Sequence, residues 1–140
     1  MRQHCFSSAA FSFRTPIIVI GLVTWPLDRF VSAEAGSDGG VLTTIPIRHR
    51  GGRLEINAAG RPDGRIAVEL LDAASRPLEG FPPSEPFTGD DLRHVVRFAG
   101  QTDVSATADK AVVLRFAMKS AELYSFAFRD KHFVKSEKLR

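Results

Sequence analysis

Cysteine is almost missing from this 140-residue chain, which contains only Cys5. A single thiol cannot close an internal disulfide, so the folded part must be held together by its apolar core. Zinc modules rich in cysteine are likewise excluded, and the four histidines stand far apart at His4, His49, His94 and His132. We therefore expect no metal site and no cofactor.

A strong excess of charge and the familiar catalytic signatures are also missing. Nineteen Lys and Arg against 16 Asp and Glu give a net charge of only +3, which does not indicate a nucleic-acid partner. The sequence has no Gly-x-Ser-x-Gly nucleophile elbow, no Walker phosphate loop and no dinucleotide fingerprint. We expect no catalytic residue, and nucleic acid is not among the expected partners.

Long apolar runs are absent except for residues 16–27, PIIVIGLVTWPL. This run is shorter than the roughly 20 residues that a membrane-spanning helix needs. Arginines precede it, and Val31 and Ala33 fit the small-residue rule for cleavage after Ala33. The pattern predicts a signal peptide over residues 1–33 and a secreted or periplasmic protein without stable membrane insertion. An uncleaved anchor helix and a misassigned start are the alternatives.

The rest of the chain contains short apolar segments that mostly alternate with polar residues. The glycine-rich residues 34–41 are expected to form a flexible linker, and residues 130–140 a basic tail. Between them, candidate strands cover residues 41–47, 53–58, 65–72, 93–100, 110–119 and 121–128, with Pro46 splitting the first or placing it at an edge. This spacing, with a turn signal at residues 61–64, RPDG, is typical of an all-β fold. We predict an antiparallel, jelly-roll-like β-sandwich over residues 42–129, preceded by the signal or anchor helix.

The segment LRFAMKSAELYSFAF, residues 114–128, has the pattern of a β-hairpin. The sequence KSAE would be its turn, and large apolar residues on both sides would face the core. Tyr124, the only tyrosine, falls on the apolar face, so we expect a core ring whose hydroxyl bonds to backbone. An exposed ring that stacks on a ligand is the alternative.

Two adjacent acids, Asp90 and Asp91, precede a strand and follow Gly89. Neighbouring side chains on an extended chain point to opposite sides, so this pair fits poorly with the facing carboxylates of a glycosidase. A turn-forming Asp90 whose carboxylate accepts nearby backbone N–H groups is the ordinary interpretation. A calcium ligand and a catalytic acid are the alternatives.

Polar side chains on the predicted strands supply a second candidate site. Asn57, His94 and Arg97, together with Asp90, could hydrogen-bond a sugar if one face of the sheet gathered them. The competing explanation for the strand arginines is cross-strand pairing with Glu55 or Glu69.

Five blocks occur in a familiar order at residues 52–58, 64–72, 77–81, 89–90 and 112–128. Their sequences are GRLEINA, G-x-I-x-V-E-L-x-D, P-L-x-G-F, G-D and V-x-L-R-F-x-M-K-x-A-E-L-Y-S-F-x-F. This order resembles the C-terminal β-sandwich of secreted bacterial proteins of the glycoside hydrolase family 32-like or sialidase-like type. The resemblance implies a sandwich in a carbohydrate-related, exported setting. In that family a five-bladed propeller carries the catalytic acids, and this chain has no room for one.

The resemblance therefore implies an accessory module without hydrolase activity. Its expected partners are a polysaccharide or a propeller-type glycosidase domain. Two alternatives remain open: a small glycan-acting hydrolase that uses Asp90 or Asp91, and a truncated fragment without retained function.

Overall fold

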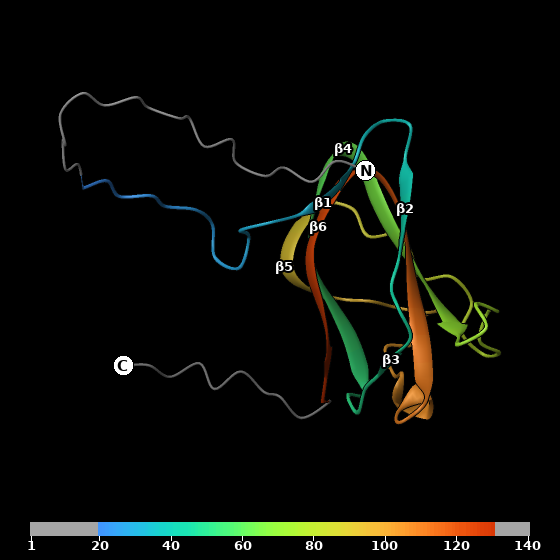
Figure 1. The fold of residues 1–140 in the computed structure, drawn as a ribbon. Coiled ribbons are helices and arrows are strands. Elements are labelled where there is room, and N and C mark those ends of the chain that lie inside the picture. The colour runs from blue at the N-terminus through green and yellow to red at the C-terminus, as the bar shows by residue number, and fades with distance from the viewer. Residues whose placement is uncertain (1–19, 131–140) are drawn as a thin grey trace.

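A computed structural model describes residues 20–130, and Figure 1 shows their arrangement. These residues form β-strands with one short 3-10 helix. The elements are β1 (Ala33–Ala35), β2 (Gly40–Thr43), β3 (Ile47–Arg48), β4 (Arg53–Asp72), β5 (Asp90–Val95), η1 (Ser105–Thr107) and β6 (Ala111–Arg129). The predicted all-β class is confirmed, and Pro46 does separate two short strands, β2 and β3.

All six strands belong to one antiparallel sheet that is built on the two long strands β4 and β6. Both long strands bend near their middle, so the sheet has two limbs that diverge downward in Figure 1. The first limb contains residues 53–60 and 121–129, with β5 on one edge and β1 on the other. The second limb contains residues 65–72 and 112–119, with β2 and β3 along β6.

The bend replaces two turns that the sequence predicts. Residues 61–64, RPDG, form a compact bulge opposite Ser120 without a partner on β6, and β4 resumes the same pairing at Arg65, so they do not separate two strands. The hairpin predicted for residues 114–128 is also wrong. Its two halves both pair with β4, and the chain passes through Ser120 at a φ of 45° without turning back.

The core lies between the limbs and follows the predicted alternation. Leu54, Ile56 and Ala58 of the first limb are buried, as are Val68 and Phe116 of the second. Because successive residues of a strand point to opposite faces, one apolar face of each limb meets the other. The rings of Phe116 and Phe126, which come from different limbs, lie 5.5 Å apart. This burial is the main source of stability in a chain without disulfides.

The amino-terminal region differs from its predicted form. Residues 20–33 contain no helix, and the remaining part of the predicted signal lies outside the described residues. Among residues 20–130, no helix is long and apolar enough to cross a membrane. The predicted linker, residues 34–41, includes parts of β1 and β2, because the exposed edge of β6 offers backbone groups for pairing.

His49, in the segment between β3 and β4, forms a hydrogen bond with the loop that contains η1. Its ring stacks on Phe128 with 3.6 Å between centroids, and its two nitrogens lie 3.1 Å from the Gly51 carbonyl oxygen and 2.9 Å from the Thr107 hydroxyl. Burial lowers the pKa of His49, against smaller opposing effects of the Gly51 carbonyl and of Asp109. The folded protein therefore favours the neutral ring.

We expect the free energy of unfolding to fall as the pH drops below about 6.5, the pKa of an unfolded histidine. Below that pH the unfolded chain takes up a proton that folded His49 binds less readily, so acid favours unfolding. His94, whose pKa burial also lowers, adds to the same trend. Urea unfolding between pH 8 and pH 5 measures the effect. His49→Gln, which cannot titrate, should flatten the slope, and a folded-state His49 pKa at or above 6.5 by NMR would contradict the prediction.

Candidate functional site

The outer face of the first limb carries polar residues that are buried. Leu54 and Ile56 of β4 point to the core, so Glu55 and Asn57 point away from it. Their exposed fractions are nevertheless only 7% and 3%. Residues 28–30, which run across this face before β1, contact Asn57 directly: its side-chain amide donates to the Asp28 carbonyl oxygen over 3.1 Å.

Arg29 is the centre of these contacts, although it precedes the first strand. Its Nε donates to Asn57 Oδ1 over 3.0 Å, and its Nη2 contacts Asp90 Oδ1 at 2.5 Å and the Ala58 carbonyl oxygen at 3.5 Å. The guanidinium carbon lies 4.7 Å from the centre of the Tyr124 ring. We call Asn57, the Ala58 carbonyl, Asp90 and Tyr124 the Arg29 site. Hydrogen bonds and a cation–π contact together enclose a side chain that is 11% exposed.

A β-bulge places Tyr124 in this site. Ala58 pairs with Leu123 and Asn57 pairs with Ser125, so Tyr124 is the extra residue on β6. The bulge turns its ring to the outer face, and its hydroxyl donates to the Glu122 carboxylate. The predicted core ring with a backbone partner is therefore wrong. The strictly alternating pattern that supported it is interrupted at this residue.

The charges of the Arg29 site stabilise one another. The hydrogen bond from Arg29 is the main reason that the pKa of Asp90 is lowered, and the same bond raises the pKa of Arg29. Burial, followed by the bond to Glu122, raises the pKa of Tyr124 to about 12. At neutral pH the site therefore holds a cation against one carboxylate and a neutral phenol.

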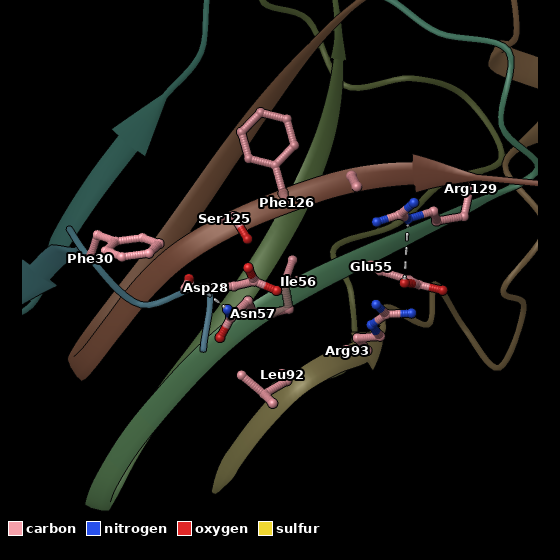
Figure 2. A pocket seen from close by; sticks show the side chains of 11 residues that line it. Asp28, Phe30, Glu55, Ile56, Asn57, Leu92, Arg93, Ser125, Phe126 and Arg129 are labelled. Atoms are coloured by element: carbon pink, nitrogen blue, oxygen red, sulfur yellow. Dashed lines mark hydrogen bonds and ion pairs between the residues drawn. The ribbon is translucent and has the colours of Figure 1, made fainter. Parts of the chain in front are cut away.

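A polar recess of about 450 Å³ adjoins the Arg29 site on the same outer face (Figure 2). It lies between β4, β5, the end of β6 and residues 28–30. Its lining consists of Asp28, Phe30, Glu55, Ile56, Asn57, Leu92, Arg93, Ser125, Phe126, Ala127 and Arg129. In Figure 2 the Phe126 ring points away from the recess, whereas the Ser125 hydroxyl lies on the side of Asn57. Leu92 and Phe30, both largely exposed, form apolar borders.

Glu55 gives this recess a fixed charge. Its carboxylate lies 2.7 Å from an Arg53 guanidinium nitrogen and 3.9 Å from Arg129 Nε, so both oxygens face cations. Arg53 Nε is buried and has no hydrogen-bond partner among the described residues. Arg93 is exposed and forms no ion pair with any residue between 20 and 130. The recess therefore offers a guanidinium and a hydroxyl, on Arg93 and Ser125, for binding.

The structure brings together two of the four predicted binding residues. Asn57 and Asp90 both contact Arg29. His94 pairs with Ile56 across β4 and β5, so it points to the core side, where its ring lies 4.5 Å from that of Phe87. Arg97 is exposed beyond the end of β5. The predicted polar face is therefore divided between two sides of the sheet.

The adjacent acids have separate local roles. Asp90 pairs with Arg29, and Asp91 Oδ1 accepts the backbone N–H of Arg93 over 2.8 Å. The predicted turn-capping carboxylate thus belongs to Asp91 and not to Asp90. Within residues 20–130, no three of the His, Cys, Asp and Glu side chains gather in a way that could hold a metal ion.

The predicted binding residues did not include Arg29 and Tyr124 of the Arg29 site, nor Arg93 and Ser125 of the recess, although an exposed Tyr124 ring was one of the alternatives. Arg29 stands two residues after the apolar run and lies within the predicted leader, so it was not considered as part of the folded module. Cleavage after Ala33 would remove Arg29 and shorten β1, which starts at Ala33.

Comparison with models of protein families, with curated proteins and with solved structures yields no match to this chain. The resemblance to the sandwich module of glycosidase-like proteins therefore stays a prediction.

Proposed function

We propose that this chain is a secreted, non-catalytic module of the sandwich type that binds a glycan weakly in the polar recess. The recess itself carries the proposal: it combines an exposed guanidinium and hydroxyl, Arg93 and Ser125, with the apolar border Leu92, all of which remain if the leader is cleaved after Ala33. Sugars present hydroxyl groups around their edge and C–H groups on their faces. Polar groups on a rigid sheet beside an exposed apolar side chain suit both surfaces.

The non-catalytic part of the proposal rests on how the carboxylates are engaged. Hydrolysis of a glycoside uses two carboxyl groups, one of which must hold a proton. Asp90 is tied to Arg29, and its pKa is lowered, which opposes protonation. Glu55 is paired with Arg53 and Arg129. Both acids are therefore engaged in ion pairs, which opposes a role for them in proton transfer to a glycoside.

A glycan array with the full chain tests the proposal, followed by calorimetry on the sugars that bind. We expect binding in the millimolar range to one class of polysaccharide. Arg93→Ala should weaken it about tenfold, which corresponds to loss of one charged hydrogen bond. The matched control is Arg65→Ala, because Arg65 is also exposed but lies in the second limb.

Three results would count against this assignment. Absence of binding to any glycan would remove the function. Equal losses with Arg93→Ala and Arg65→Ala would move the site away from the recess. Release of reducing sugar that Asp90→Asn abolishes would favour the small-hydrolase alternative.

A further inference from the structure

The segment that carries Arg29 is attached to the first limb mainly through polar contacts. Its apolar neighbours stay in solvent: Leu27, Phe30 and Val31 are 71%, 67% and 62% exposed. Arg29, in contrast, is 11% exposed and contacts Asn57, Asp90 and the Tyr124 ring. The guanidinium and the Asp28 carbonyl, rather than an apolar side chain, therefore join this segment to the sheet.

The groups that receive Arg29 are positioned without help from its segment. Asn57 and Ala58 lie on β4, Asp90 begins β5, and Tyr124 is the bulged residue of β6. Of these three strands, β4 lies in the middle and pairs with both β5 and β6. The Arg29 site is therefore a property of the sheet, and residues 28–30 occupy it as a ligand would.

The chemistry of the site selects a guanidinium. A planar group can donate to the Asn57 oxygen through Nε and to the Asp90 carboxylate through Nη2 while its face lies on the Tyr124 ring. An ammonium ion has no planar face to stack and no fixed fork of donors. Lysine would therefore satisfy only part of the same site.

We propose that the Arg29 site is an arginine-binding site, filled in this structure by the chain's own Arg29. It takes an arginine side chain from an extended peptide when residues 28–30 withdraw or are removed. The glycan recess shares Asn57 and residues 28–30 with the Arg29 site, but its proposed binding groups, Arg93 and Ser125, form no hydrogen bond with the Arg29 guanidinium. The two proposals can therefore fail independently.

Chemical rescue of the full-length Arg29→Ala variant tests the proposal. This variant has an empty site, so N-acetyl-L-arginine amide should raise its melting temperature in a saturable way. For a ligand that binds at about 10 mM, 100 mM should give a rise of about 5 °C. N-acetyl-L-lysine amide is the matched compound, and the wild type, whose site is filled, is the matched protein. Equal shifts with both compounds, or equal shifts in both proteins, would overturn the proposal.

A second pair of variants keeps the test decisive. If circular dichroism shows that Arg29→Ala does not fold, Arg29→Lys replaces it, because lysine retains the cation and the aliphatic stem. The arginine compound should still stabilise Arg29→Lys more than the lysine compound does. Adding Asp90→Asn to either variant should abolish the difference between the compounds. A difference that survives Asp90→Asn would place binding elsewhere.

The source of the arginine is tested with partners in trans. A synthetic peptide that contains Leu-Asp-Arg-Phe-Val should bind Arg29→Ala, and its Leu-Asp-Lys-Phe-Val counterpart should bind at least tenfold more weakly. Mixing Arg29→Ala with full-length Asp90→Asn asks whether a second copy of this chain donates the segment. Dimers in light scattering would identify that source, and peptide binding without dimers would identify a different chain. Failure of the arginine peptide to exceed its lysine counterpart would refute the site.

Discussion

Gly64→Ala is expected to destabilise the protein by about 3 kcal/mol, at the upper end of the cost of overpacking. A Cβ atom at residue 64 would lie 2.3 Å from the Ser120 carbonyl oxygen and 2.6 Å from the Arg61 nitrogen. Both of these atoms are backbone, so neither can rotate away. The methyl group would force β4 and β6 apart at the bend, where the two limbs depend on their close approach.

The matched control for this change is Gly36→Ala. A Cβ atom at residue 36 would meet nothing within 4 Å, and the substitution should change stability by less than about 0.5 kcal/mol. Urea unfolding of the two variants gives the comparison directly. Equal stability of the two variants would mean that the strands do not cross as closely as the bend requires.

Phe116→Ala is expected to cost about 3–5 kcal/mol, the usual range for truncation of a buried ring. Phe116 is completely buried and belongs to the cluster that joins both limbs. Its removal leaves a cavity between the two limbs, which cannot close over it without disturbing the pairing of β4 with β6. Denaturation by urea, with ligand absent, measures the loss.

Two further truncations show whether burial sets this loss. Phe126 packs against the same cluster but is only partly buried, so Phe126→Ala should cost less than Phe116→Ala. Leu92 is 44% exposed, so Leu92→Ala should cost less than about 0.5 kcal/mol. A cost below 1 kcal/mol for Phe116→Ala would contradict its assignment to the core.

The alternation of apolar and polar residues was enough to predict the all-β class and most core faces, because a strand repeats every two residues. Leu54 and Phe116 were placed correctly on this basis. The connection between segments was not predictable in this way. RPDG has the composition of a turn and does fold into a local bulge, but β4 and β6 resume their pairing beyond it, so it does not separate two strands. Such pairing is a property of two distant segments.

The candidate site was only partly predictable for a related reason. Asn57 and Asp90 could be proposed because polar groups interrupt an apolar pattern. Tyr124 could not be placed, because one bulged residue reverses the face that a period of two assigns. Arg29 could not be connected to Asn57 or Asp90, because its role depends on contacts between residues that are far apart in sequence.

The bend also determines how the chain can reach this structure. Each limb needs both β4 and β6, so neither limb corresponds to a continuous piece of chain that could fold first. The pairing runs from Asp72 with Val112 to Arg53 with Arg129, and every pair closes a loop that contains the whole of β5. Loop closure of this kind precedes most of the stabilising contacts and slows the search for the folded state, typically to milliseconds or seconds. Folding of the two limbs should therefore be one cooperative step whose rate is set by topology.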